Sequence, residues 1–339
     1  MGSSSPFLDL FRARAGAGGV MTFARFMQLA LYDPELGYYR QPRRRIGRAP
    51  GTDFFTASSS PLFGELVAAA CASLLVARTA DPRDFTFIEI GAEPFGPAPD
   101  RTGGARAGVK HPFGAAKVIR LGEPLDLNGK CVVFSNELFD AQPFHRFVFR
   151  AGVWRELGVA LRDGALVEIE LPGPNPLALS SVEGPAQLPD TASEGYHLDV
   201  PLAAAALAAK IAGQPWQGLF LACDYGKSWR ELTEHAPAGT ARAYFRHVQS
   251  SDLLARPGEQ DLTCHVCWDW LADALARHGF STPQVDSQEA FFIHHAADFL
   301  AATAAAEAGR FSEKKLSLLQ LLHPAHLGQK FQVLSAWRG

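Results

Sequence analysis

A buried strand that ends abruptly in polar residues constrains this chain most. The apolar run Val-Val-Phe at 132–134 is followed by Ser-Asn-Glu-Leu-Phe-Asp at 135–140. An unbroken run of β-branched and aromatic residues is typical of a strand covered on both faces in a parallel sheet. Ligands of open α/β sheets bind at the carboxyl ends of such strands. Packing alone does not require an amide and two carboxylates there, so these side chains are candidates for a functional site.

Two other strand-like runs end in the same way. Residues 85–90 lead to Glu89-Ile90-Gly91, and residues 219–223 lead to Asp224-Tyr225-Gly226. Apolar periodicity and capping residues predict helices over 22–31, 60–77, 200–212, 268–278, 296–308 and 312–322. Strands that alternate with helices predict an α/β fold with a doubly wound parallel sheet. In such a sheet the three polar tips would share one edge.

The pattern along the chain predicts three regions. Residues 1–80 are expected to form an N-terminal helical region with a loop that covers the binding crevice, and residues 81–295 are expected to form the α/β core. An antiparallel β-hairpin insertion is expected at about 144–195, because turn residues at 151–152 and 163–164 separate alternating runs. Residues 296–339 are expected to form a helical extension.

Composition limits the partners of the chain. With 339 residues and a formal net charge of −3, it has no charge excess that would favour nucleic acid. No window approaches the roughly 20 apolar residues of a membrane span, and no secretory signal is predicted, so a cytoplasmic location is expected. The pair Cys264 and Cys267 lacks the second ligand pair that a structural zinc site needs, and no metal is predicted.

Short motifs follow one another in a characteristic order. They are Leu-Tyr-Asp-Pro-x-x-Gly-Tyr-Tyr at 31–39, Ile-Gly at 46–47 with Asp-Phe-x-Thr at 53–56, Phe-Gly-Glu at 63–65, Asn-Glu-Leu-Phe-Asp-Ala at 136–141, Asp-Tyr-Gly at 224–226, Gly-Thr-x-Arg-x-Tyr at 239–244 and Asp-Leu-Thr-x-His-Val at 261–266. In this order the motifs resemble the S-adenosylmethionine (SAM)-dependent methyltransferases related to the mitochondrial complex I assembly factor, also called the MidA family. The resemblance covers roughly residues 23–295.

This resemblance implies a Rossmann-like class I methyltransferase fold, SAM as cofactor, and methyl transfer to a protein side chain, which is arginine in the family. Carboxylates would orient the planar guanidinium group through paired hydrogen bonds. The residues expected to act in catalysis are Glu137, Asp140, Asp261 and His265. Those expected to bind the cofactor are Gly47, Asp53, Phe54, Thr56, Glu89, Gly91 and Asn136. Those expected to bind the substrate are Asp224, Tyr225, His247 and Thr263.

The chain departs from the family after its first predicted core strand. The family has a glycine-rich loop there, whereas this chain keeps Glu89 and Gly91 but continues with Glu93 and Pro94. Glycines let the backbone approach a ligand, and Glu93 would place a negative charge near the carboxylate of SAM. Residues 92–116 are too few for a full helix, strand and return helix, which predicts a truncated first βαβ crossover.

Three functions stay open on the sequence alone. The chain is an active protein methyltransferase, or an inactive pseudo-methyltransferase that binds a protein partner, or an enzyme that uses the same crevice for another small molecule. Some of these residues also have a possible structural role. Asn136 and Asp140 can cap a helix, and Asp261 and Thr263 can form a turn. His247 and His265 can be core residues. No oligomeric state is predicted.

Overall fold

The computed structural model describes residues 5–42, 45, 53, 57, 60–92, 111–172, 188–309 and 312–339. The chain divides into two compact units. Unit one comprises residues 1–43, 139–207 and 227–271, and unit two comprises residues 44–138, 208–226 and 272–339. The units therefore interleave along the chain, and the domain boundaries proposed from the sequence stay a prediction.

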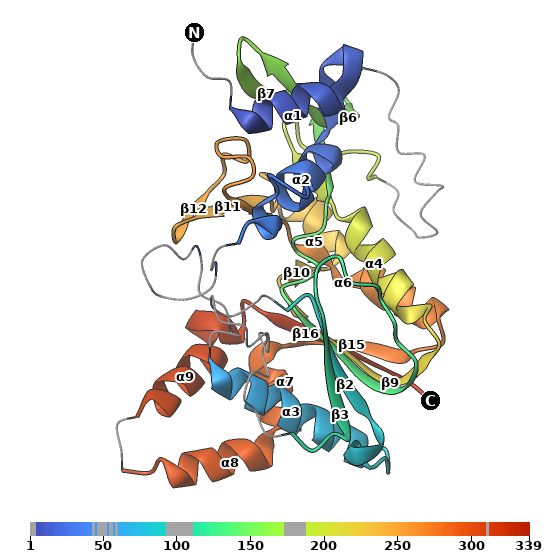
Figure 1. Cartoon of the computed structure of the whole chain (residues 1–339), viewed down its shortest axis with the longest axis vertical. Helices are drawn as coiled ribbons and strands as arrows, with labels where there is room; N and C mark the ends of the chain where they lie inside the picture. The colour runs from blue at the N-terminus through green and yellow to red at the C-terminus, as the bar shows by residue number, and fades with distance from the viewer. Residues whose placement is uncertain are drawn as a thin grey trace. The chain divides into compact units, whose positions relative to one another are not determined.

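Unit two is built on a six-stranded mixed sheet (Figure 1). Its strands, in spatial order, are β15 (Ser281–Ser287), β16 (Gln332–Arg338), β9 (Trp216–Asp224), β4 (Gly129–Asn136), β2 (Thr86–Ile90) and β3 (Ala115–Ile119). The last four run parallel to one another, whereas β16 is antiparallel to both of its neighbours. The predicted α/β fold is confirmed, and the sheet is mixed because two strands that the sequence pattern did not predict join its end.

Helices cover one face of this sheet (Figure 1). They are α3 (Pro61–Val76), α7 (Gln288–His295), α8 (Ala297–Ala306) and α9 (Glu313–Leu322). Phe63 of α3 contacts Phe134 of β4, with ring centroids 6.2 Å apart. On the other face Phe280 packs against Trp216 and Phe220. Apolar contacts on both faces explain why the central strands carry unbroken apolar runs.

The connection between the parallel strands β2 and β3 is the crossover that the sequence predicts to be truncated. It comprises residues 91–114, of which residues 93–110 lie outside the described part of the chain. The departure from the family at Glu93 and Pro94 falls there as well. The truncation therefore stays a prediction.

Unit one contains an antiparallel sheet. Its strands are β1 (Val20–Thr22), β5 (His145–Arg150), β6 (Val153–Arg162), β7 (Ala165–Glu170) and β8 (His197–Val200). The turns predicted at 151–152 and 163–164 join β5 to β6 and β6 to β7. All four turn residues have positive φ angles between 50° and 81°, as in the tight turns whose twist suits a hairpin. The predicted antiparallel pairing is thus confirmed.

The remaining elements of unit one are short. They are α1 (Pro6–Ala15), α2 (Phe23–Tyr32), α5 (Trp229–Glu234), β11 (Arg242–Phe245), β12 (Val248–Ser250), β13 (Asp261–Thr263) and β14 (Val266–Cys267). Helix α2 begins after Thr22, whose side chain accepts a hydrogen bond from the main-chain N–H of Arg25. Strand β11 pairs with both β12 and β13. Three elements cross the boundary between the units: α4 (Leu202–Ala212), β10 (Gly226–Lys227) and α6 (Trp268–Arg277).

Within the described ranges, no helix combines the length and the apolar character that a membrane span requires.

Candidate functional site

Three neighbouring parallel strands of unit two end at one edge of the sheet. In the register of the sheet, Ile90 of β2 lies beside Ser135 of β4, and Asn136 of β4 lies beside Cys223 of β9. The residues that follow each strand therefore lie at the same carboxyl edge. The structure brings together the tips that carry Gly91, Glu137 and Asp224 in this way. Their roles in binding or catalysis stay predictions.

Asn136 and Glu137 form a fixed pair at the tip of β4. The side-chain Nδ2 of Asn136 donates to Oε1 of Glu137 across 2.9 Å, and the main-chain N–H of Glu137 donates to the carbonyl of Cys223 across 3.0 Å. Glu137 has a left-handed φ of 49°, which a side chain with a Cβ adopts at some cost in free energy. The Oδ1 atom of Asn136 is buried and has no hydrogen-bond partner among the described residues. This atom can accept a hydrogen bond from a ligand.

Gly91 ends β2 in a conformation that favours glycine. Its φ is +81°, and a Cβ at this position would stand 2.7 Å from Cδ1 of Leu138. Its N–H donates to the carbonyl of Ile119 across 2.9 Å. Glu89, two residues earlier, is buried on the sheet face that also carries Phe87. The tip of β2 therefore has a glycine, Gly91, close to the buried carboxyl group of Glu89.

Asp224 and Tyr225 form the tip of β9. Asp224 is fully buried, and its Oδ1 accepts a hydrogen bond from the main-chain N–H of Tyr225 across 2.8 Å. The Tyr225 ring packs on Phe331, with centroids 4.0 Å apart. These contacts stabilise the chain where it leaves the sheet. They give Asp224 a structural role, and its substrate-binding role stays a prediction.

Unit one holds a separate group of tyrosines and acids, here called the aromatic–acid group: Tyr32, Tyr39, Asp140 and Asp261. The hydroxyl of Tyr39 donates to Oδ1 of Asp261 across 2.8 Å, and the ring of Tyr39 stacks on Tyr32 with centroids 5.6 Å apart. The hydroxyl of Tyr32 donates to the carbonyl of Ala141, the residue after Asp140, across 2.8 Å. Both aspartates are buried.

Burial raises the pKa of Tyr39 well above its ordinary value, and the negative charge of Asp261 adds to this effect. Tyr39 is therefore a protonated donor at any physiological pH. Two stacked rings beside two buried carboxyl groups suit a planar cation, because guanidinium groups both stack on rings and bond to carboxylates.

His265 lies between β13 and β14 in unit one. Its main-chain N–H donates to Oγ1 of Thr240 across 3.1 Å, and its buried Nδ1 has no hydrogen-bond partner in the described ranges. Burial, followed by the positive charges of Lys227 and Arg242, lowers the pKa of His265 to about 4. With this pKa the ring is neutral at pH 7 and carries a single N–H, so one ring nitrogen is a donor and the other an acceptor. The imidazole can thus give a hydrogen bond to a ligand but is poorly suited to store a proton.

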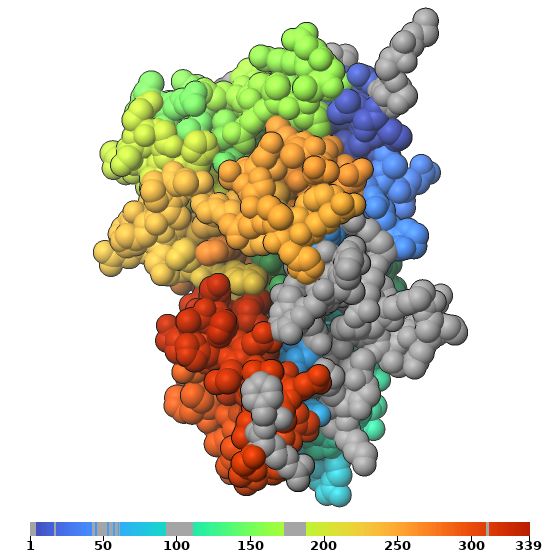
Figure 2. Space-filling model, turned by 90° about the vertical axis from the view of Figure 1, so that its left-hand side faces the viewer, coloured from blue at the N-terminus to red at the C-terminus, as the bar shows by residue number. Residues whose placement is uncertain are grey.

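Two residues predicted to bind substrate lie apart on the β11–β12–β13 sheet. His247 and Arg246 are the central residues of the two-residue turn between β11 and β12, with φ angles of 65° and 49°. The turn is exposed, and the orange segment that contains it lies at the surface in Figure 2. Thr263 is half-buried and pairs with Arg242 at the other end of β11. His247 is thus placed at a hairpin tip, away from Thr263.

The predicted cofactor residues of the segment 47–56 fall mostly outside the described part of the chain. Gly47, Phe54 and Thr56 lie outside the described residues. Asp53 is described and fully buried in unit two, where its N–H donates to the carbonyl of Arg45 across 2.7 Å.

Cys264 and Cys267 are both buried, and neither forms a disulfide. Burial raises the pKa of Cys267 to about 12, so this sulfur is protonated and is a poor metal ligand. Within the part of the chain that the structure describes, no group of three or more ligand side chains could hold a metal ion.

The sequence analysis assigned no role to Tyr32, Tyr39 or Thr240. The first two lie in the Leu-Tyr-Asp-Pro-x-x-Gly-Tyr-Tyr motif and the third in Gly-Thr-x-Arg. These motifs were the available signal, but their spacing does not reveal that Tyr39 contacts a carboxyl group 222 residues later in the chain.

Comparison with known proteins adds to this geometry. Residues 117–285 match a family model described as "Putative S-adenosyl-L-methionine-dependent methyltransferase". No curated protein matches the chain.

Two crystal structures from Burkholderia thailandensis are similar to the whole chain. One is of a "COG1565 superfamily member and likely methyl transferase" bound to S-adenosyl-homocysteine. It is 25% identical, has a TM-score of 0.79, and is matched over 100% of this chain and 95% of its own. The other is a native structure of an uncharacterized COG1565 superfamily protein, 24% identical with a TM-score of 0.77 and the same coverage. The first match confirms the predicted Rossmann-like fold class.

Proposed function

We propose that this chain is a SAM-dependent methyltransferase that modifies a protein side chain, with arginine as the acceptor. The observation that carries the proposal is the edge of the unit-two sheet, where Gly91, Asn136 and Glu137 end adjacent parallel strands. The match of residues 117–285 to a methyltransferase family, and the similar structure that holds S-adenosyl-homocysteine, both support this cofactor.

The residues at this edge fit the cofactor chemically. SAM carries an ammonium group, two ribose hydroxyls and a carboxylate, and it supplies an electrophilic methyl group on its sulfonium when bound. The unpartnered Oδ1 of Asn136 suits a donor such as the ammonium group. Gly91 lets the chain take a positive φ at the tip of β2, and the acids Glu89 and Glu137 can accept from hydroxyl groups.

The aromatic–acid group of unit one supports a guanidinium acceptor. An arginine nitrogen must be oriented toward the methyl group, and it must lose a proton as it is methylated. Asp140 and Asp261 can bind the guanidinium and take up this proton, and the stacked rings of Tyr32 and Tyr39 can pack against its plane. His265 remains neutral and contributes a hydrogen bond.

The proposed acceptor and biological role rest on the ordered motifs, which resemble those of the MidA family. This resemblance supports a protein acceptor and a role related to the assembly of a respiratory complex. None of the five cysteines forms a disulfide, which is typical of a reducing compartment, and we propose that the activity is cytoplasmic.

Titration calorimetry with SAM and S-adenosyl-homocysteine, followed by transfer of labelled methyl groups to arginine-containing peptides and proteins, tests the proposal. We expect binding of both ligands and methylarginine in the product. Absence of heat at millimolar ligand would refute the cofactor. Binding without transfer to any protein would point to the inactive alternative, which the ligand-bound structure at 25% identity does not favour.

Substitution at Asp261 separates acceptor from cofactor functions. Asp261→Asn should retain SAM affinity but lose most methyl transfer, because the amide carries no charge for the guanidinium. Asp269→Asn is the matched control, since Asp269 also accepts a main-chain N–H, that of Trp229 at 2.6 Å, but lies outside the aromatic–acid group. Equal losses in the two variants would contradict the assignment of Asp261.

A further inference from the structure

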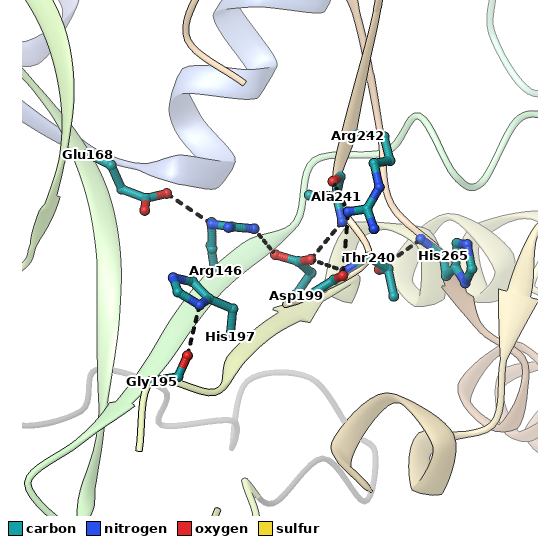
Figure 3. A network of polar contacts seen from close by, with 10 residues as sticks. Arg146, Glu168, Gly195, His197, Asp199, Thr240, Ala241, Arg242 and His265 are labelled. Atoms are coloured by element: carbon teal, nitrogen blue, oxygen red, sulfur yellow. Dashed lines mark hydrogen bonds and ion pairs between the residues drawn. The ribbon is translucent and has the colours of Figure 1, made fainter. Parts of the chain in front are cut away.

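A buried ion pair between Arg146 and Asp199 lies in the sheet of unit one, and the sequence analysis expected no role for either residue (Figure 3). The side chain of Asp199 on β8 is 0% exposed, and its Oδ1 accepts a hydrogen bond from Nη1 of Arg146 on β5 across 2.7 Å. Arg146 also donates from Nε to Glu168 on β7 across 2.9 Å. Burial alone would lower the pKa of Arg146, but the two acidic neighbours outweigh it and raise the pKa, so the guanidinium group is charged.

The second oxygen of Asp199 holds a loop. Its Oδ2 accepts hydrogen bonds from the main-chain N–H groups of Thr240 and Ala241, across 2.6 and 2.8 Å. Gly239 precedes them with a φ of +67°, and a Cβ at this position would stand 2.5 Å from Oδ2 of Asp199. The loop therefore closes around the carboxylate, and both oxygens of Asp199 are used as acceptors.

This loop in turn fixes the position of His265. The hydroxyl oxygen of Thr240 accepts the main-chain N–H of His265 across 3.1 Å. Arg242 follows the loop, donates to the carbonyl of Ala241 across 2.6 Å, and pairs with Thr263 on β13. Figure 3 shows the resulting chain of contacts from Glu168 through Arg146, Asp199 and Thr240 to His265.

We propose that Asp199 is a positioning residue for the acceptor side of the reaction: with Arg146 it sets the loop 239–241, and through Thr240 it sets the place of His265. Asp199 itself contacts neither cofactor nor substrate. A buried ion pair contributes little net stability compared with apolar packing, but it defines one geometry for the groups around it. The effect on methyl transfer rests on the proposed function, whereas the effect on His265 does not.

Asp199→Asn tests the proposal because an amide cannot replace a carboxylate whose two oxygens both accept. We expect kcat for methyl transfer to fall about 10- to 100-fold, the loss typical of a displaced reactive group, while SAM affinity stays within about twofold. The matched control is Glu156→Gln. Glu156 is 3% exposed, and its Oε1 lies 2.7 Å from Nδ1 of His145, the residue next to Arg146 on β5. Among the described residues, no hydrogen bond joins the Glu156 side chain to the loop 239–241. Glu156→Gln should lower the melting temperature comparably but keep kcat within about twofold. Equal kcat losses in both variants would overturn the proposal.

Substitutions at Thr240 give a second test, which remains valid even if Asp199→Asn is too unstable to assay. Thr240→Ser keeps the hydroxyl that accepts from His265 and should keep kcat, whereas Thr240→Val has the same shape without the acceptor and should lose activity as Asp199→Asn does. Similar activity of the serine and valine variants would overturn the link to His265.

A spectroscopic measurement distinguishes failure of this inference from failure of the proposed function. The backbone amide and imidazole ¹⁵N signals of His265 should shift in Asp199→Asn and Thr240→Val but not in Thr240→Ser or Glu156→Gln. These shifts are expected even if no methyl transfer is found. Unchanged His265 signals in Asp199→Asn would refute the positioning role directly.

Discussion

The side chain of Asn136 is oriented by the carboxylate of Glu137, its neighbour at the tip of β4. Nδ2 of Asn136 donates to Oε1 of Glu137 across 2.9 Å, which leaves Oδ1 of Asn136 buried and unpartnered among the described residues. An amide held in this way presents an acceptor of fixed direction at the sheet edge. Its identity as an amide, rather than an acid, matters because only the amide has an N–H to donate to the neighbouring carboxyl group.

Asn136→Asp should therefore weaken cofactor binding. It replaces the donor by a second carboxylate beside Glu137, and we expect the affinity for S-adenosyl-homocysteine to fall at least tenfold and the free energy of unfolding to fall by about 1–3 kcal/mol. Calorimetry and urea unfolding measure the two effects. Asn128→Asp is the control, because Asn128 likewise donates to an acid, Asp126 at 3.2 Å, but on the surface. A comparable affinity loss in the control would contradict the site.

Gly91→Ala tests whether the tip of β2 contacts the cofactor. Gly91 and Gly164 both have a φ of +81°, but a Cβ at 91 would meet Leu138 whereas a Cβ at 164 would meet nothing within 4 Å. Both alanine variants should lose about 1 kcal/mol of stability from backbone strain. Only Gly91→Ala should also lose affinity for S-adenosyl-homocysteine. If Gly91→Ala keeps its affinity for S-adenosyl-homocysteine, Gly91 is not part of the cofactor site.

Tyr39→Phe should impair the acceptor side of the reaction. The variant removes the hydroxyl that donates to Asp261, and we expect a loss of about 1–2 kcal/mol in stability and a larger relative loss in kcat/KM for the acceptor than for SAM. Tyr196→Phe is matched, since the Tyr196 hydroxyl also donates across 2.8 Å, to the carbonyl of Leu232, in the same unit. Its activity should stay near that of the unmodified protein, and steady-state kinetics of the two variants decides the matter.

His265 predicts a pH dependence of stability. Its pKa is about 4 in the fold against an ordinary 6.5, so the unfolded chain binds the proton more tightly. Stability is fully present above pH 6.5 and falls as the pH decreases toward 4. At pH 5 the loss from this residue is about 2 kcal/mol. Urea unfolding of the protein and of His265→Gln at pH 7.5 and pH 5 should show a smaller loss in the variant; parallel losses would exclude this origin.

Arg338 ties the end of β16 to the helices beside the unit-two sheet. Its guanidinium donates to the carbonyls of Ala212 at 2.7 Å, His278 at 3.0 Å and Gln214 at 2.8 Å, and also to that of Trp216. Arg338→Ala should cost about 2–4 kcal/mol of unfolding free energy, because several carbonyls lose a charged donor at once. Arg83→Ala removes a surface pair with Asp81 and should have little effect. Thermal and chemical unfolding compare them.

Much of the fold follows from local sequence patterns. The parallel strands β2, β4 and β9 are apolar runs that end in polar residues, and the two hairpin turns carry residues that tolerate positive φ. Strands β15 and β16 were not predicted. Ser281–Ser287 has largely exposed side chains and no apolar run, and the pairing of β16 with β9 joins residues about a hundred positions apart, which no local pattern encodes.

The candidate site was predictable only where fold rules apply. The shared edge of parallel strands indicated Gly91, Asn136 and Glu137 as neighbours. The contacts of Asp199 could not be predicted from the sequence, because its partners Thr240 and Ala241 lie 41 and 42 residues later in the chain. Both partners donate main-chain N–H groups, and every residue except proline has such a group, so their residue types give no signal. His247 shows the converse: a motif position that the fold places in an exposed turn.

The place of β16 has a consequence for synthesis. Residues 332–338 are translated after all other strands of the sheet, yet they lie between β9 and β15. Until they leave the ribosome, β9 and β15 each present an unpaired edge in the nascent chain, and open strand edges promote association with other chains. The sheet of unit two is therefore completed only when β16 inserts between β9 and β15, and a chain that is still being made exposes more open strand edge than the finished fold.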